Sequence, residues 1–108
     1  MIRILVAFPL DPGVLDRLNE IPEFEISTRP GLTPEQLLDE VRSADALLCG
    51  GSPVVSAPVL AAASDLKLIV NSGAADAVDM EAAQRGRIEV RTIAGDGTVA
   101  VLKDFFNV

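Results

Sequence analysis

The residue types that most often carry out acid–base and nucleophilic chemistry are scarce in this chain. Its 108 residues include no histidine, which excludes Ser-His and Cys-His catalysis and histidine-ligated metal sites within them. The one cysteine, Cys49, ends an apolar run and has no basic neighbour in sequence, which favours a small core residue over a nucleophile. A single cysteine forms neither an intrachain disulfide nor a cysteine-based zinc site. No catalytic residue or metal ligand is therefore expected.

Turns that contain glycine are the remaining candidates for a ligand-binding site. There are three of them: Gly50-Gly51-Ser52, Asn71-Ser72-Gly73 and Gly95-Asp96-Gly97-Thr98. Turns of this kind expose backbone N–H groups and helix N-termini, which bind carboxylate or phosphate groups. The alternative is that glycine only permits tight turns here.

Residues 95–100 match the dinucleotide-binding pattern G-x-G-x-x-A, after an expected strand and before an expected helix. A true site of this type lies in the first βαβ unit and needs an acidic residue about 20 positions later. Because the sequence continues for only eight residues after Ala100, we interpret the match as coincidental and Thr98 as a helix N-cap. Asp79 is likewise interpreted as an N-cap rather than as half of a carboxylate pair with Asp76.

Five apolar runs alternate with five helical patterns along the chain. The apolar runs cover residues 2–8, 24–26, 46–49, 66–70 and 88–93. Helices are expected after Asp11, Thr33, Ser56, Asp79 and the turn at residues 95–98. Gly86 is expected to end the fourth helix in the C′ position. This βα alternation predicts parallel strands joined by right-handed crossovers, with helices on both faces of the sheet.

The pattern of apolar and charged residues within the runs also predicts the order of the strands. The first, third and fourth runs are mostly apolar, with Arg3 and Lys67 as their charged residues, as in strands buried on both faces, whereas the second and fifth alternate with Glu or Arg. The flavodoxin-like order 2-1-3-4-5 places those two strands at the edges. We therefore predict a single α/β domain over residues 1–108, a flavodoxin-like three-layer sandwich. A ligand is expected outside the carboxyl ends of the strands, near the switch point between strands one and three.

Charge and hydropathy narrow the range of partners. Nine Lys and Arg against 16 Asp and Glu give a net charge of −7, which argues against nucleic acid and anionic membranes as partners. Neither a signal peptide nor a membrane span is evident, so we expect a cytoplasmic domain. Hydrophobic residues make up 49% of the chain, enough for it to fold alone.

Several segments resemble successive landmarks of the D-2-hydroxyacid dehydrogenases, with the D-3-phosphoglycerate dehydrogenase branch the most similar. Four of them come early: Ile4-Leu5-Val6-Ala7 with Pro9-Leu10, residues 32–38, residues 44–48 and residues 66–69. Residues 73–79 resemble the family's glycine-rich loop, shortened by one residue, and residues 79–86 resemble the helix after it. Thr98-Val99-Ala100-Val101 resembles the interdomain helix.

The resemblance implies the substrate-binding domain of that family, a flavodoxin-like lobe. In the family an inserted NAD-binding domain carries the catalytic Arg, Glu and His, and nothing in this chain resembles it, so no cofactor site is expected. The resemblance implies substrate-binding positions in two turns: Gly50, Gly51, Ser52, Ser72, Gly73 and Ala74. The family usually has Arg-Ser in the first turn, so this chain lacks a cationic contact there. Weak binding of a small carboxylate is the expectation.

We therefore expect a lobe without catalytic residues that acts as a stand-alone folding module. A natural small-ligand or protein-binding module is one alternative, and a subunit that needs a nucleotide-binding partner chain is another. Residues 102–108 resemble the helix that returns after the family's inserted domain. A splice near residues 99–102, engineered or excised, is the hypothesis that this suggests, with natural truncation as the alternative.

The last helix has more apolar residues than one core-facing stripe needs. They are Val99, Val101, Leu102, Phe105 and Phe106. The sequence therefore leaves open a homodimer formed through this helix, opposed by the net charge at low salt.

Overall fold

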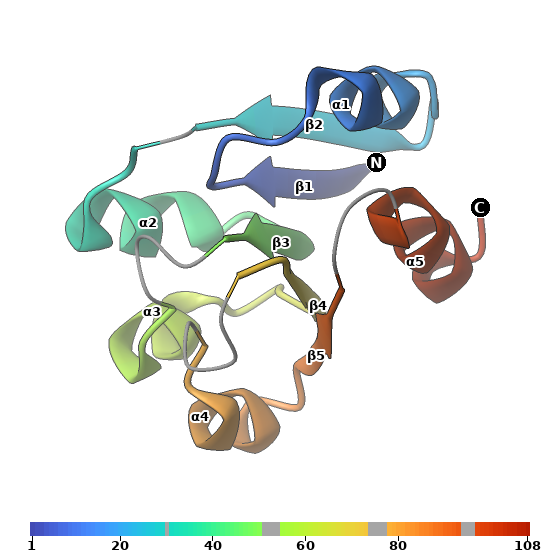
Figure 1. Cartoon of the computed structure of the whole chain (residues 1–108). Coiled ribbons are helices and arrows are strands. Elements are labelled where there is room, and N and C mark those ends of the chain that lie inside the picture. The colour runs from blue at the N-terminus through green and yellow to red at the C-terminus, as the bar shows by residue number, and fades with distance from the viewer. Residues whose placement is uncertain (30, 51–54, 74–77, 94–96) are drawn as a thin grey trace.

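Five parallel strands form one sheet in the order β2-β1-β3-β4-β5 (Figure 1), as predicted. This computed structural model describes residues 1–29, 31–50, 55–73, 78–93 and 97–108. The strands are β1 (Ile2–Val6), β2 (Phe24–Thr28), β3 (Ala46–Cys49), β4 (Leu68–Asn71) and β5 (Glu89–Thr92). The helices are α1 (Pro12–Asn19), α2 (Pro34–Val41), α3 (Ala57–Ala62), α4 (Met80–Arg85) and α5 (Gly97–Phe106).

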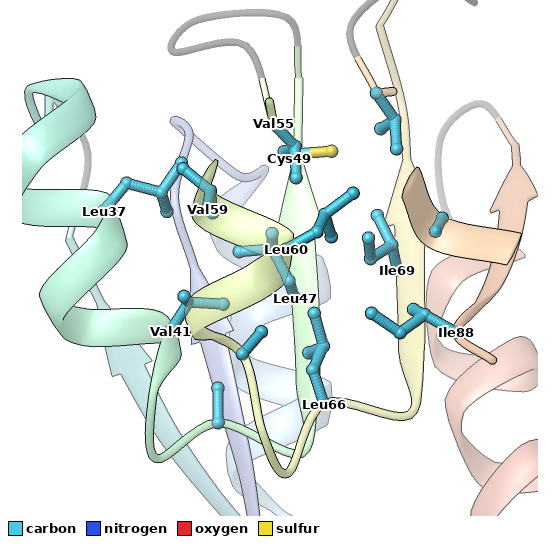
Figure 2. Close-up of a cluster of buried hydrophobic side chains, with 14 of the residues drawn as sticks. Leu37, Val41, Leu47, Cys49, Val55, Val59, Leu60, Leu66, Ile69 and Ile88 are labelled. Atoms are coloured by element: carbon cyan, nitrogen blue, oxygen red, sulfur yellow. The ribbon is translucent and has the colours of Figure 1, made fainter. Parts of the chain in front are cut away.

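Helices cover both faces of the sheet, so the predicted three-layer sandwich is confirmed. Helices α2, α3 and α4 pack on the face that carries Leu5, Leu47 and Ile69 (Figure 2). Helices α1 and α5 pack on the opposite face, which carries Val6 and Val70. This division follows from right-handed crossovers, because the chain moves in one direction along the sheet from β1 to β2 and in the other direction from β2 through β3 and β4 to β5.

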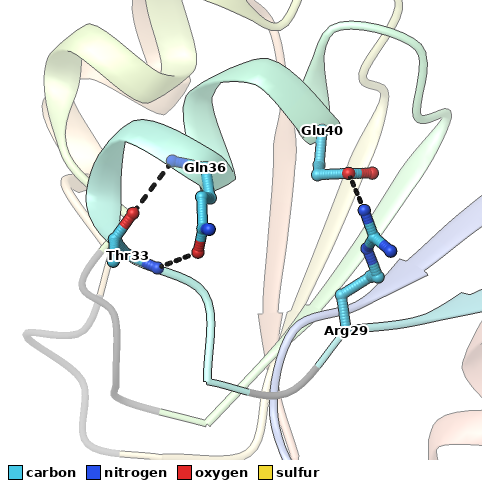
Figure 3. Close-up of polar contacts among 4 residues, drawn as sticks. All are labelled: Arg29, Thr33, Gln36 and Glu40. Atoms are coloured by element: carbon cyan, nitrogen blue, oxygen red, sulfur yellow. Dashed lines mark hydrogen bonds and ion pairs between the residues drawn. The ribbon is translucent and has the colours of Figure 1, made fainter.

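Three of the helices begin at the N-cap residues that the sequence predicts. Thr33 accepts the Gln36 N–H at 3.2 Å while the Gln36 side chain accepts the Thr33 N–H at 2.9 Å, which is a complete capping box (Figure 3). Asp11 caps α1 by accepting the Val14 N–H, and Asp79 caps α4 in the same way. Each cap pairs backbone N–H groups that the helix itself leaves without partners.

The end of α4 differs from the prediction. Gly86 has an ordinary φ of −85°, and Arg87 takes the left-handed conformation with a φ of +58°. The Arg87 N–H donates to the Gln84 carbonyl oxygen and the Ile88 N–H to that of Ala83, which is a Schellman motif with arginine at C′. The prediction of Gly86 at C′ is wrong by one residue, because burial of Ile88 sets where the helix ends.

Replacing Arg87 by glycine is expected to raise the free energy of unfolding by about 0.5–1 kcal/mol, because glycine adopts a positive φ without a steric penalty. Gly86→Ala is the matched control. A Cβ at Gly86 would make only ordinary contacts, 3.4 Å or more from its neighbours, so this variant should change stability little. Urea unfolding of both variants measures the difference, and a destabilised Arg87→Gly variant would contradict this interpretation of the helix end.

The start of α5 also corrects a prediction. The helix begins at Gly97, so Thr98 lies inside its first turn and is 1% exposed. Thr98 is therefore not the N-cap, and the position before Gly97 lies outside the described residues. The helix continues unbroken through residues 99–102, and the splice suggested for that segment stays a prediction.

The apolar residues of α5 pack within the domain. Val99 and Leu102 are buried, and Val101, Phe105 and Phe106 are half-buried against the same core. The rings of Phe106 and Phe24 make an edge-to-face contact with centroids 6.1 Å apart. None of these five side chains is fully exposed. A homodimer through α5 stays a prediction.

Candidate functional site

The predicted ligand crevice lies where the chain leaves β1 and β3 toward opposite faces of the sheet. After β1 it continues to α1, and after β3 it continues to α3 on the other face. Phe8 and Gly50 meet at this point. A Cβ added to Gly50 would lie 2.5 Å from Phe8 Cδ2, so the Phe8 ring packs directly on the Gly50 backbone. Position 50 must therefore lack a side chain while Phe8 keeps this position.

Asn71 organises the turn that follows β4. Its side chain is 1% exposed, and its Oδ1 accepts the Gly73 N–H at 2.9 Å and lies 3.8 Å from Cys49 Sγ. The Ser72 N–H donates to the Cys49 carbonyl oxygen at 2.9 Å. These bonds tie the turn after β4 to the end of β3, so Gly50, Ser72 and Gly73 come together at the carboxyl edge of the sheet.

The structure describes three of the six substrate-binding positions that the resemblance implies, namely Gly50, Ser72 and Gly73. The other three, Gly51, Ser52 and Ala74, lie outside the described residues. The N–H groups of Ser72 and Gly73 already donate within the chain. A bound carboxylate would therefore compete with Asn71 Oδ1 for the Gly73 N–H, which is a physical reason to expect weak binding.

Sequence reasoning gave Asn71 no individual role. Its signal is an asparagine at the end of an apolar run with glycine two positions later, the spacing of an Asx turn. The contact between Phe8 and Gly50 has no comparable local signal, because the two residues belong to different strand ends that only the folded sheet brings together.

Cys49 is a core residue, as predicted. Its side chain is 2% exposed in the cluster beneath α2 and α3 (Figure 2). Burial raises the pKa of the Cys49 thiol to about 12, since the apolar surroundings disfavour the thiolate. The thiol is therefore protonated at neutral pH and is no nucleophile in the folded protein.

Positive charge is concentrated away from the carboxyl edge. The N-terminal starts of the strands and the last turns or ends of the helices lie at the opposite, amino edge, and seven cationic residues occur there: Arg3, Arg17, Arg42, Lys67, Arg85, Arg87 and Lys103. The other two cations lie toward the carboxyl edge. Arg29, directly after β2, pairs with Glu40 at 2.5 Å (Figure 3), and Arg91, the next-to-last residue of β5, pairs with Glu89. The segments that connect β1, β3, β4 and β5 to the next helices contain no Lys or Arg and four Asp.

At Gly97 and Ala100, the described small residues of the dinucleotide-binding pattern, the packing that such a site needs is not found. In a true site one glycine lets the backbone approach the pyrophosphate and the last small residue packs the helix against its strand. A Cβ on Gly97 would make an ordinary contact, 3.6 Å from Ile93 Cδ1, and Ala100 is exposed rather than packed on the sheet. The residues described there do not fit NAD.

Within the ranges above, no cluster of three or more His, Cys, Asp and Glu side chains is placed to hold a metal ion. None of the helices seen there has the length and apolar character needed to cross a membrane.

Comparison with known proteins links this fold to one enzyme family. The family described as "D-isomer specific 2-hydroxyacid dehydrogenase, catalytic domain" matches residues 4–101. The D-3-phosphoglycerate dehydrogenase of Methanocaldococcus jannaschii is 38% identical over 92 residues, which are 83% of this chain and 17% of that protein. The enzyme of the same name from Archaeoglobus fulgidus is 29% identical over 99 residues, covering 91% of this chain and 19% of that one. The chain thus spans less than a fifth of these relatives.

Solved structures show the same fold. The TT0316 protein of Thermus thermophilus is 34% identical, with a TM-score of 0.76 over 94% of this chain and 36% of that one. The NAD⁺-bound 3-phosphoglycerate dehydrogenase of Entamoeba histolytica is 23% identical, with a TM-score of 0.75 over 84% of this chain and 32% of that one. The second likeness supports the fold alone. Both cover only about a third of the solved chain.

Proposed function

Since the chain belongs to the D-isomer specific 2-hydroxyacid dehydrogenase family, we propose that it is the substrate-binding domain of such an enzyme and does not catalyse hydride transfer alone. The family match over residues 4–101 carries this proposal, and the sheet order β2-β1-β3-β4-β5 agrees with the flavodoxin-like lobe that the sequence resemblance implies. It also confirms the resemblance inferred from the sequence segments.

The chemistry of the reaction supports the proposal that this domain binds the substrate and does not catalyse hydride transfer alone. Oxidation of a 2-hydroxy acid removes a hydride from C2 and a proton from the hydroxyl group, so it needs a hydride acceptor and a base. This chain contains no histidine, and its one thiol is buried and protonated. What its residues can supply at the carboxyl edge is binding and orientation through backbone N–H groups.

The chain alone is expected to show no saturable NADH binding up to about 1 mM, the upper end of usual KM values. NADH fluorescence titration measures this, with a complete 2-hydroxyacid dehydrogenase as the positive control. An assay of NADH oxidation with a series of 2-oxo acids should give no turnover above the buffer rate. Saturable fluorescence enhancement, or turnover by the chain alone, would contradict the proposal.

A partner added in trans separates this proposal from the alternative of an enzyme subunit. The nucleotide-binding domain of a 2-hydroxyacid dehydrogenase is mixed with the chain and the same assay is repeated. Turnover that depends on both components would favour a subunit completed by a separate chain. Absence of turnover in the mixture is the result expected for a folding module.

A further inference from the structure

The outer edge of β2 has no part in the proposed function. In the described sheet β2 pairs only with β1 and ends the sheet on that side (Figure 1). Its residues from Glu25 to Thr28 are exposed except for Ile26, which is half-buried. A sheet edge of this kind presents N–H and C=O groups that another strand can bind.

The hydrogen bonds to β1 show which residues of β2 face this edge. The Glu23 carbonyl oxygen accepts the Ile2 N–H at 2.9 Å, and the Arg29 N–H donates to the Val6 carbonyl oxygen at 2.8 Å. Because successive residues of a strand turn their backbone groups to opposite sides, every second residue between Glu23 and Arg29 also bonds to β1. The residues that direct their N–H and C=O groups outward are therefore Phe24, Ile26 and Thr28.

A second copy of β2 fits this edge when it runs antiparallel. Outward-facing residues must lie opposite one another for the backbone hydrogen bonds to form, so a two-fold axis can pass through residue 25, 26 or 27. An axis at Glu25 sets two carboxylates face to face, which is destabilising. An axis at Ser27 sets the Phe24 carbonyl oxygen opposite Pro30, which has no N–H to donate.

An axis at Ile26 avoids both conflicts. The two Ile26 residues exchange both of their backbone hydrogen bonds, and each Thr28 N–H reaches the Phe24 carbonyl oxygen of the other copy. The Phe24 N–H is not needed for this pairing, because it already donates to the Ile21 carbonyl oxygen at 3.1 Å.

The side chains are also complementary in this register. Glu23 of one copy lies opposite Arg29 of the other, and both side chains are exposed. Arg29 also pairs with Glu40 of its own chain, so it is shared between two carboxylates. Ile26 lies opposite its own copy and covers apolar surface that is partly exposed in the single chain. The strand thus matches its own reversed sequence in hydrogen bonds, charge and apolar contact.

We propose that the outer edge of β2 binds a second copy of this chain through antiparallel strand pairing centred on Ile26, which joins two five-stranded sheets into one. This interface is separate from α5 and does not depend on the proposed function. Strand pairing alone buries less than the roughly 1,200 Å² of a stable interface, and the net charge of −7 opposes association. The expected dissociation constant is therefore about 0.1–1 mM.

Two lysine variants test the register by sedimentation equilibrium, at up to about 1 mM chain in about 0.3 M NaCl to screen the net charge. Ile26→Lys sets two cations face to face on the axis and is expected to weaken the dimer at least about tenfold. Ser27→Lys is the matched control, because it gives the same net charge (−7 + 1 = −6) but lies opposite Glu25 of the other copy. It is expected to keep or raise the affinity. Circular dichroism checks that each variant is folded.

Cross-linking tests the same axis without adding a charge. Ile26→Cys gives opposite residues whose Cα atoms are about 5.5 Å apart, within the range that a disulfide spans. Thr28→Cys is the control, because its two copies lie about 13 Å apart along the strands. With oxidised glutathione, Ile26→Cys is expected to form disulfide-linked dimers at least about tenfold faster than Thr28→Cys. Cys49 is buried and should not contribute.

The outcomes decide between this interface and its alternatives. A dimer that is lost in Ile26→Lys, kept in Ser27→Lys and cross-linked at position 26 is the predicted result. A chain that stays monomeric at the highest concentration, equal effects of the two lysine variants, or equal cross-linking rates at positions 26 and 28 would each overturn the proposal. A dimer that Phe105→Ala weakens and Ile26→Lys does not would place the interface on α5 instead.

Discussion

The thiol of Cys49 is expected to react with a thiol reagent at pH 8 at least about a thousandfold more slowly in the folded protein than in the unfolded chain. Burial raises its pKa from 9.0 to about 12, which lowers the thiolate fraction by about three powers of ten. The side chain is also 2% exposed beneath α3, so access is restricted as well. Reaction with a chromogenic disulfide, in buffer and in 6 M guanidinium, measures both rates.

Cys49 also makes stability depend on alkaline pH. Above pH 9 the unfolded chain releases the thiol proton while the folded protein retains it, so stability that is present below pH 9 is lost as the pH rises toward 12. The slope is at most about 1.4 kcal/mol per pH unit, the value for one proton. Cys49→Ala is the control and should remove this component of the slope. Rapid labelling of the folded protein, or a slope unchanged in Cys49→Ala, would show that the thiol is not buried as described.

Replacing Leu102 by alanine is expected to lower the free energy of unfolding by about 3 kcal/mol and the Tm by about 10–20 °C. Leu102 is 0% exposed and packs with Val14 and Leu18 of α1 in the core beneath α1 and α5. Truncation removes apolar contacts and leaves a cavity that the rigid sheet fills poorly. For a domain with a total stability of about 5–15 kcal/mol, this is a large fraction.

Val101→Ala is the matched control for Leu102→Ala. Val101 is the preceding residue of α5 and is half-buried, so its truncation should cost less than about 1 kcal/mol. Urea unfolding monitored by circular dichroism compares the two variants. Similar small effects at both positions would mean that α5 does not dock on the sheet as described, and the account of the second face would fail.

The strand order was predictable because the extent to which a strand is buried is visible in the polarity of its own residues. Edge strands face solvent on more sides than central ones, so β2 and β5 retain Glu25 and Arg91 among their apolar residues, whereas β3 and β4 are buried throughout. The capping box of Thr33 and Gln36 was predictable for the same reason, since its partners lie three residues apart.

The features that escaped prediction depend on contacts between distant segments. Gly86 is the local signal for a helix end, but the buried position of Ile88 moves the left-handed residue to Arg87. The ring of Phe8 on Gly50 joins residues 42 positions apart (50 − 8 = 42), and no local pattern reports it. The sequence placed the candidate site at the carboxyl edge of the sheet, which stays a prediction, while the contacts among the residues at that edge required the folded structure.

The central claim, that the carboxyl edge of this sheet holds the carboxylate of a 2-hydroxy acid, is tested most directly by amide chemical shifts with D-lactate. Because the N–H groups of Ser72 and Gly73 already donate within the chain, a carboxylate must compete for them, and hydrogen bonds of about 1 kcal/mol each predict millimolar or weaker binding. The account predicts saturable shifts gathered at Gly50, Ser72 and Gly73, and none with D-lactamide, which lacks the carboxylate. Shifts gathered instead in the groove beside Arg17 and Lys103, between α1 and α5, or equal shifts with the amide, would contradict it.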